Sequence, residues 1–348
     1  MRLKEIRLVD RRVGDNYPCY IVAEIGGLFK NFEEAKRLID SAIEIGVDAV
    51  KFQTLEAETA TTKSNYFDMK ATGRVSQYEL LKGFEIPAEL QMQVVKYARD
   101  CGIAIFSAPS HMKDLELMEK MDLPIYKIGS DLACHIPLLK KVAGFGKPII
   151  LSTGMCTLDE IKRSVDTILS AGNEQLVLLH CVSDYPAKLE EANLNAILTM
   201  KKEFQLPVGF SDHAIGLLVA LGGAIIGANL IEKHFRDPKN SPSPDDIHAL
   251  DKKEFSHLIE SIRVIERARG DGIKVPTDSE RKNLLTNRVS IVALRDIHVG
   301  ETITEDMIDI RRPGTGIQPI YFDKVLGMKA KSTIVKEEPL TLDKLSSK

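Results

Sequence analysis

Eight short apolar runs, each rich in Val, Ile and Leu, constrain the fold of this chain more than any other feature. They occupy residues 20–24, 48–52, 103–107, 124–130, 148–152, 176–181, 207–211 and 229–235. Segments with helical periodicity lie between or after most of them, at residues 31–45, 87–101, 111–121, 157–171, 192–203, 215–227 and 252–269. Strands that alternate with helices in this way predict an α/β fold of the (β/α)₈ TIM-barrel type, in which catalytic groups lie at the C-terminal ends of the strands.

The ends of these runs carry acids, bases and hydroxyl groups. The residues are Glu24, Lys51, Ser107, Lys127, Ser152, His180, Ser211 with His213, and Lys233 with His234. Solvation of a surface does not require such side chains at every strand end, so the pattern predicts an enzyme. A polar insertion at 54–86, with Tyr66, Phe67 and Tyr78, follows the second run. We expect it on the active-site face, as a loop that covers the substrate.

The barrel pattern ends near Gly270, which predicts a barrel domain over residues 1–270. Residues 271–286 are polar and contain Gly and Pro, which predicts a linker. Residues 287–348 alternate short β-like segments with turns, including the RPGTG run at 312–316. This pattern indicates a small β-rich C-terminal domain that is too small to hold a deep pocket alone.

The composition argues against several classes of binding partner. A formal net charge of -3 gives no electrostatic reason to expect nucleic acid or an anionic membrane surface. No apolar run approaches the roughly 20 residues that span a bilayer, and the first residues lack the apolar core of a secretory signal. The five cysteines are scattered and lack CxxC spacing. We therefore expect reduced thiols in a cytoplasmic protein, with neither disulfides nor a zinc site.

Two histidines at neighbouring strand ends indicate a metal site. His213 follows the seventh run and His234 lies in the eighth, and adjacent strands are about 4.8 Å apart, so both imidazoles can reach one ion. Two neutral nitrogens leave positions for water and substrate oxygens, which suits Mn²⁺ or Mg²⁺ better than a structural zinc. The alternative is two unrelated polar histidines near a rim. His180 and His248 are further candidate ligands, and neither is favoured.

Lysines and serines at the strand ends predict an anion-binding cradle. Its members are Lys51, Lys127 and Lys233, which strand position directs into the mouth of the barrel, with Ser130, Ser152 and Ser211. Such a set would hold a phosphate and a carboxylate of one small substrate. Backbone N–H groups of KIGS (127–130) and STGM (152–155) would add to it. The alternative for each lysine is a rim position paired with a nearby acid.

Several other residues near the mouth are candidates whose roles the sequence leaves open. Glu24, in AEIGG, would act as a general base, orient water or pair with a barrel lysine. Asp212 would orient a ligand rather than react. Asp245 and Asp246, in SPSPDD, would bind substrate hydroxyls or form a solvated acidic turn, and Tyr185 has the same standing.

These residues stand in strings that resemble the sialic acid synthase family, which includes the N-acetylneuraminate, legionaminate and pseudaminate synthases. The strings are AEIG (23–26), DAVKFQT (48–54), YKIGSD (126–131), ILSTGM (150–155), LLHCVSDYP (178–186), VGFSDHAIG (208–216), IEKHF (231–235) and RRPGTGI (311–317). They follow the family's order along the chain, and the combination is highly specific. The resemblance implies a barrel followed by an antifreeze-like (SAF) domain, with the boundary near residue 285.

The resemblance also implies an activity and a set of site residues. The family condenses phosphoenolpyruvate with an N-acylated amino-hexose aldehyde and releases phosphate. By resemblance, the residues that bind phosphoenolpyruvate would be Lys51, Lys127, Ser130, Ser152, Ser183 and Ser211. The residues that contact the sugar would be Gln53, Tyr185 and Asp245. Glu24 would be the catalytic carboxylate, and His213 and His234 would hold the divalent metal, usually Mn²⁺.

The family's SAF domain packs over the barrel of the partner subunit. The resemblance therefore implies a domain-exchanged homodimer in which Arg312 reaches the neighbour's sugar.

Three positions depart from the family's pattern. The loop GGLFKN (26–31) stands where the family has an Asn-His-x-Gly loop and is one residue shorter. Leu132 stands where the family has a glutamate that contacts the sugar, and Ala108 stands where a hydroxyl residue is common. Because loss of a polar partner changes discrimination strongly, we expect an unusual acceptor sugar. The alternatives are a catalytically silent sugar-binding paralogue and a barrel enzyme of the 3-deoxy-heptulosonate synthase kind.

Overall fold

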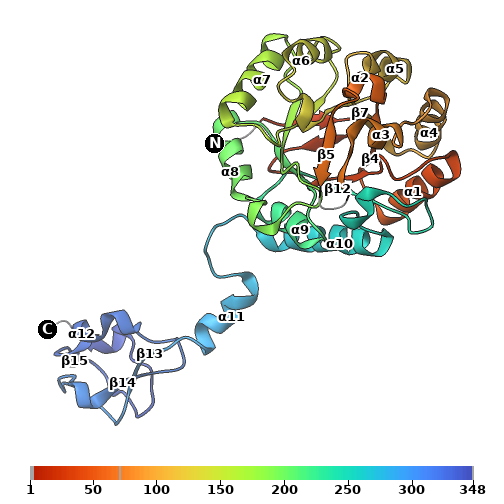
Figure 1. Cartoon of the computed structure of the whole chain (residues 1–348). Helices are drawn as coiled ribbons and strands as arrows, with labels where there is room; N and C mark the ends of the chain where they lie inside the picture. The colour runs from red at the N-terminus through yellow and green to blue at the C-terminus, as the bar shows by residue number, and fades with distance from the viewer. Residues whose placement is uncertain (1–3, 70–71, 347–348) are drawn as a thin grey trace. The chain divides into compact units, whose positions relative to one another are not determined.

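Residues 4–69 and 72–346 are described by the computed structural model. The chain divides into two units, Met1–Gly270 and Asp271–Lys348 (Figure 1). Among the described residues, no helix combines the length and the apolar character that a membrane crossing requires.

Eight parallel strands of the first unit close into a barrel. In chain order they are β3 (Tyr20–Glu24), β4 (Ala49–Thr54), β7 (Ala104–Pro109), β8 (Tyr126–Ile128), β9 (Ile149–Ser152), β10 (Leu176–Cys181), β11 (Val208–Asp212) and β12 (Leu230–His234). Each strand pairs with the next in sequence, and β12 pairs with β3 to close the ring. The predicted (β/α)₈ barrel is therefore confirmed.

A ring of helices surrounds the strands (Figure 1). The helices that follow the strands are α1 (Phe32–Ile45), α4 (Ala88–Asp100), α5 (Asp114–Lys120), α6 (Ile136–Ala143), α7 (Leu158–Ser170), α8 (Asn195–Phe204), α9 (Leu218–Ile226) and α10 (Lys252–Arg269). Capping boxes begin α7, with Thr157 and Glu160, and α10, with Asp251 and Glu254. The sequence did not predict α6, because eight residues are too few for a clear helical period.

Alternation along the strands separates two buried layers. The layer inside the barrel includes Tyr20, Val22, Ala49, Phe106, Ile150, Val177, Leu179 and Leu230. The layer between strands and helices includes Ile21, Val50, Ile105, Leu151, Leu178, Phe210 and Ile231. Successive side chains of a strand point to opposite faces, so the parity of a strand-end residue decides whether it faces the mouth or the helices.

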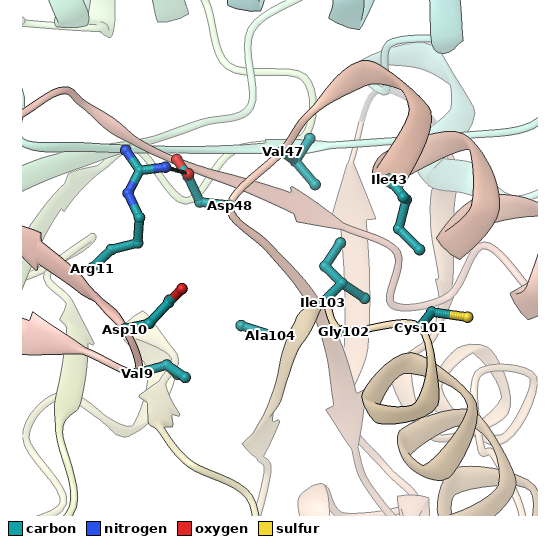
Figure 2. Close-up of a pocket in the computed structure, with 10 residues that line it drawn as sticks. All are labelled: Val9, Asp10, Arg11, Ile43, Val47, Asp48, Cys101, Gly102, Ile103 and Ala104. Carbon is teal, nitrogen blue, oxygen red and sulfur yellow. Dashed lines mark hydrogen bonds and ion pairs between the residues drawn. The ribbon is translucent and has the colours of Figure 1, made fainter.

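A hairpin closes the N-terminal end of the barrel. Its strands, β1 (Ile6–Leu8) and β2 (Arg11–Val13), bury Ile6, Leu8 and Val13 in the same cluster as the barrel interior. A cavity of about 430 Å³ lies beside the hairpin turn, against the segments that precede β4 and β7 (Figure 2). Arg11 reaches Asp48 across it in an ion pair, and Asp48 Oδ2 also accepts the N–H of Ile21 at 2.7 Å. These contacts hold the end of the barrel together.

The insertion between β4 and β7 has secondary structure of its own. It contains α2 (Ala57–Ala60), the hairpin of β5 (Tyr66–Met69) and β6 (Gly73–Ser76), and α3 (Gln77–Lys82). It follows the C-terminal end of β4, which is the active-site face of a barrel.

The second unit is a small β-rich domain. Its elements are α11 (Asp278–Thr286), β13 (Ser290–Ala293), β14 (Ile308–Arg311), α12 (Phe322–Val325), β15 (Lys329–Ala330) and β16 (Leu345–Ser346). Its core contains Ile291, Ile297, Ile303, Ile308, Ile334 and Leu340.

The segment 271–286, predicted as a linker, differs from that prediction in part. Residues 278–286 form α11, which begins with a capping box of Thr277 and Glu280. None of its residues is buried, so no apolar stripe revealed the helix in the sequence. The end of α11 is fixed by the N–H of Gly314, which donates to the Leu285 carbonyl at 2.8 Å.

Candidate active site

Inward-facing residues at the strand ends form a polar cluster at the C-terminal mouth of the barrel. They are Glu24, Lys51, Lys127, Ser152, Ser211, Glu232 and His234, and all are buried. The register places Glu24 between Lys51 of β4 and His234 of β12, and Ser211 beside Glu232. The lysines, serines and acids named in the sequence analysis are thus neighbours in space, apart from the exceptions below.

Lys233 does not belong to the anion cradle, so the expectation that it points into the mouth was wrong. It shares the outward parity of Ile231. Its ammonium donates to Asp212 Oδ2 at 2.8 Å and to the Ala214 carbonyl. Lys233 therefore forms a buried ion pair beneath the helices, and Asp212 is its partner.

Ser107 and His180 also face outward, away from the mouth. Ser107 Oγ lies 2.7 Å from Thr54 Oγ1. His180 Nε2 donates to the Ala192 carbonyl at 2.8 Å, and its ring stacks on Phe210 at 5.6 Å between centroids. Neither residue can contribute to a site above the barrel.

Glu24 and Lys51 form a buried ion pair at the mouth. Glu24 Oε1 also accepts the N–H of Gly26 at 2.5 Å. A Cβ at Gly26 would lie 2.8 Å from Gln53 Cγ and would collide with Glu24 as well, so only glycine fits here. Burial raises the pKa of Glu24 although the Lys51 ammonium opposes the shift. Burial also disfavours the charged form of Lys51, but the carboxylates of Glu24 and Glu232 outweigh it and raise the Lys51 pKa.

Lys127 lies at the centre of a second polar network. Its ammonium donates to Ser152 Oγ at 2.7 Å and lies 3.3 Å from Glu232 Oε1. Ser211 Oγ donates to the same carboxylate oxygen at 2.8 Å. Burial alone would raise the Glu232 pKa, but Lys127 and Lys51 outweigh burial and lower it, so this carboxylate is ionised.

Glu232 is the site residue that the sequence analysis missed. It stands two residues before His234 in β12 and shares its inward parity, a spacing that was visible in IEKHF. With Glu232 beside Lys127 and Glu24 beside Lys51, both lysines of the cradle already have an acidic partner. An ammonium has three donors, so Lys127 keeps capacity for an anion beside Ser152 and Glu232.

The loops after β8, β9 and β10 converge on one point. The N–H of Gly154 donates to Ser130 Oγ at 2.9 Å. A Cβ at Gly154 would lie 2.8 Å from Ser130 Oγ and would also collide with Ser183 Oγ. Ser183 Oγ is buried and has no hydrogen-bond partner within the described part of the chain. Two hydroxyl groups, one of them held by a backbone N–H, thus converge where an oxyanion can bind.

Three histidines and a tyrosine cluster beside the acids. The ring centroids of His213 and His234 are 5.6 Å apart, those of His234 and His248 are 4.5 Å apart, and Tyr185 lies 4.2 Å from His213. His213 Nδ1 donates to the Val182 carbonyl at 2.9 Å, which leaves the Nε2 lone pair free.

Asp245 stands between two of these imidazoles. Its Oδ2 is 3.7 Å from His234 Nδ1 and its Oδ1 is 3.9 Å from His248 Nε2. Burial lowers the pKa of His248 to about 3 and that of His234 well below its usual value, so both rings are neutral. Burial, aided by Glu24, raises the pKa of Asp245 to about 7.

These donors fit a divalent cation. His234 Nδ1 and both ring nitrogens of His248 are buried and have no hydrogen-bond partner among the described residues. Neutral imidazoles together with a carboxylate are ligands that divalent metal ions accept.

The positions that depart from the family's pattern have distinct surroundings. Leu132 packs against the outer core. Asp131 instead turns back, because a Cβ on Gly129 would collide with Asp131 Oδ1. Ala108 is inward and pairs in register with Gln53, and it is 7% exposed.

The shortened loop serves the barrel itself, because Asn31 caps α1 by accepting the N–H of Glu34 at 3.0 Å. In the second unit, Arg312 is exposed, and its Nε donates to the Asn287 carbonyl at 3.0 Å.

Comparison with known proteins gives consistent matches. The NeuB family model matches residues 38–274 and the SAF domain model matches residues 288–346. The chain is 36% identical to N,N'-diacetyllegionaminic acid synthase of Campylobacter jejuni, over 87% of this chain and 93% of that protein. It is 34% identical to pseudaminic acid synthase of the same species, over 90% and 93%. A solved N-acetylneuraminic acid synthetase from Leptospira borgpetersenii is 29% identical, with a TM-score of 0.73, over 81% of this chain and 96% of that chain.

Proposed function

Because the chain belongs to the NeuB family, we propose that it is a nonulosonate synthase. It condenses phosphoenolpyruvate with an N-acylated amino-hexose aldehyde and releases phosphate. One observation carries this proposal: two buried lysines and a set of convergent hydroxyls lie at the same mouth as a buried carboxylate and a histidine cluster. An anion site beside a proton-transfer site and a metal-fitting site is what this condensation needs.

The lysines and hydroxyl groups of the mouth suit phosphoenolpyruvate, which carries a carboxylate and a phosphate. Lys51, Lys127 and Ser152 face the mouth together with Ser211, and they bind its carboxylate and phosphate. The loop hydroxyl groups of Ser130 and Ser183 add donors for the phosphate oxygens, and the Gly154 N–H holds Ser130 Oγ in place.

The reaction adds three components and expels one. C3 of phosphoenolpyruvate attacks the aldehyde carbon of the sugar, positive charge develops at C2, and water adds there. The aldehyde oxygen takes up a proton and becomes a hydroxyl. The tetrahedral intermediate then loses phosphate by cleavage of the C2–O bond to the phosphorus-bearing oxygen, while its C2 hydroxyl gives up its proton and becomes the ketone. Lys51 and Lys127 stabilise the charge that accumulates on the departing phosphate. Glu24, whose pKa is raised by burial, takes the proton of the attacking water.

His213 and His234 would hold the divalent metal, Mn²⁺ in first place with Mg²⁺ as the alternative. When bound, the ion supplies Lewis-acid polarisation of the aldehyde oxygen. Gln53, Tyr185 and Asp245 orient the sugar beside it.

A second copy of the chain completes the site in this proposal. The C-terminal domain of one copy covers the barrel of the other in an exchanged homodimer, where Arg312 contacts the sugar. The exposure of Arg312 and its single backbone contact leave the guanidinium available. Arg312→Ala should raise the sugar KM and leave phosphoenolpyruvate binding unchanged. Size-exclusion chromatography with light scattering should give twice the monomer mass.

The deciding experiment is phosphate release from phosphoenolpyruvate with Mn²⁺, across a panel of 2-acylamino and 2,4-diacylamino hexoses. Release that depends on one sugar supports the proposal and identifies the acceptor. If no sugar causes phosphate release and calorimetry detects no binding of phosphoenolpyruvate, the proposal is overturned in favour of a catalytically silent paralogue.

A further inference from the structure

We propose that His248 and Asp245 are direct ligands of the divalent metal in addition to His213 and His234, so that three imidazoles and one carboxylate hold the ion. This inference rests on the proposed function, in which His213 and His234 are the metal ligands. It adds two protein ligands from the segment that follows β12, and it changes the role of Asp245, which otherwise contacts the sugar.

The geometry of the three side chains carries the inference. One ligand atom from each of His234, Asp245 and His248 lies within 4.8 Å of the other two. An ion about 2.1 Å from each ligand places ligand atoms about 3.0 Å apart at right angles and about 4.2 Å apart when opposite. His234 Nδ1 lies 3.7 Å from Asp245 Oδ2, and His248 Nε2 lies 3.9 Å from Asp245 Oδ1. Both distances fall within this range.

These ligand atoms are not engaged elsewhere. His234 and His248 are 5% and 1% exposed, and His234 Nδ1 and His248 Nε2 have no hydrogen-bond partner in the part of the chain that the structure describes. Buried polar atoms are normally satisfied, and the exceptions call for an explanation. Here one bound cation satisfies both nitrogens at once.

The backbone holds the set in place. Asp245 belongs to the 3₁₀ helix η3 (Pro244–Ile247), and His248 follows it directly. Residues three apart on a 3₁₀ helix lie above one another, so Asp245 and His248 face the same side. A capping box between Ser243 and Asp246 fixes the start of this turn. The N–H of Leu250 donates to the His234 carbonyl at 2.9 Å, which ties the segment to β12.

The ligand chemistry has a consequence for the metal. Three imidazoles and one carboxylate fill four positions of an octahedral ion and leave two open for substrate. The carboxylate offsets one of the two positive charges, so the ion is retained before any substrate binds. A site of two histidines alone would depend on substrate oxygens to complete its ligand set.

Metal binding without substrate tests the inference. The full-length protein is stripped with EDTA, and Mn²⁺ is titrated without sugar or phosphoenolpyruvate while free Mn²⁺ is followed by EPR. The variants are H248Q and D245N, with H180Q as the matched control. His180 is an outward-facing imidazole whose hydrogen bond to the Ala192 carbonyl a glutamine amide can keep.

We expect H248Q and D245N each to weaken Mn²⁺ binding at least about tenfold, and H180Q to leave the Kd unchanged. Pulsed EPR of bound Mn²⁺ should lose one nitrogen coupling in H248Q and none in D245N. Circular dichroism and the unfolding midpoint in EDTA check that each variant is folded. If H248Q does not fold, D245N still tests the inference.

Wild-type Kd values for both H248Q and D245N, with loss of binding only in H213Q and H234Q, overturn the inference. The phosphate-release assay separates this failure from failure of the proposed function. Sugar-dependent release by the wild type alongside unaffected Mn²⁺ binding in H248Q rejects the ligand set alone.

Discussion

The two ends of the barrel bury polar groups in opposite ways. At the N-terminal end, Asp48 forms an ion pair with Arg11, lies 3.5 Å from Arg263 and accepts the N–H of Ile21. At the C-terminal end, Ser183 Oγ, Glu232 Oε2 and His234 Nδ1 are buried without a hydrogen-bond partner among the residues that are described. Both ends are built by the same strands.

The contrast shows which end is made for a ligand. A satisfied carboxylate stabilises the fold and gains nothing from a bound molecule. Buried polar groups without a partner lower stability, and each calls for an explanation. One of them, Tyr20 Oη, lies near Asp48 at the N-terminal end, whereas those at the C-terminal end belong to one polar cluster that a ligand can complete. Substitutions should therefore divide into those that lose activity at the C-terminal end and those that lose stability elsewhere.

Glu24→Gln should produce the largest effect. If Glu24 accepts a proton from the attacking water, the variant loses about 10²–10⁴-fold in kcat while binding phosphoenolpyruvate, measured by calorimetry. Because burial raises the pKa of Glu24, the wild-type rate should fall with decreasing pH at a value above the ordinary glutamate pKa of about 4.3. The residual rate of the variant should lack this acidic limb. A near-normal kcat would remove Glu24 from the mechanism.

Lys127→Met and Lys233→Met test the parity of strand-end lysines. The Lys127 variant should lose about 10²–10³-fold in kcat/KM for phosphoenolpyruvate, because a donor to the departing phosphate is gone. The Lys233 variant leaves Asp212 buried without its partner, so its free energy of unfolding should fall by about 3–5 kcal/mol. Steady-state kinetics and urea unfolding of both variants measure the two effects. Equal catalytic losses in the two variants would contradict the assignment of Lys233 to the outer layer.

These two lysines also show how far the sequence leads. Apolar runs of strand length were enough to predict the barrel, and the family motifs identified the family that the comparisons confirm. Residue spacing placed Glu24, Lys51 and Lys127 at the mouth. It failed for Lys233, because the exact end and parity of β12 decide between Glu232 and Lys233, and a run of apolar letters does not fix that parity.

Contacts between distant segments were harder to predict than strands. The approach of His248 to His234 depends on a short 3₁₀ turn, which has no periodic pattern to detect. The sequence did not predict α11, because none of its residues is buried and it therefore has no apolar stripe. The 3₁₀ turn η1 (Ser130–Leu132) brings Asp131 Oδ1 back beside Gly129 while Leu132 packs against the core, a local arrangement that the order of the two residues does not reveal.

Asp48→Ala tests the N-terminal end. The change leaves the Ile21 N–H without its acceptor and Arg11 without its ion pair. The free energy of unfolding should fall by about 1–3 kcal/mol, measured by urea denaturation. The kcat and KM of the folded variant should stay within about twofold of the wild type, because the substitution lies at the end of the barrel opposite the catalytic mouth. A large loss of kcat with unchanged stability would mean that the cavity in Figure 2 takes part in function.

Asp131→Asn should have the smallest effect and the most specific one. The family's sugar-contacting glutamate is replaced by Leu132, which packs against the core, whereas Asp131 turns toward Gly129 at the mouth. If the Asp131 carboxylate accepts a sugar hydroxyl, its loss should raise the sugar KM about tenfold, since hydrogen bonds to charged groups contribute about 1.5–3 kcal/mol. The KM for phosphoenolpyruvate should not change. Leu132→Ala is the matched control, because removal of a packed side chain should lower the unfolding midpoint without changing the sugar KM. The opposite result, a sugar effect from Leu132→Ala and none from Asp131→Asn, would restore position 132 as the one that selects the acceptor.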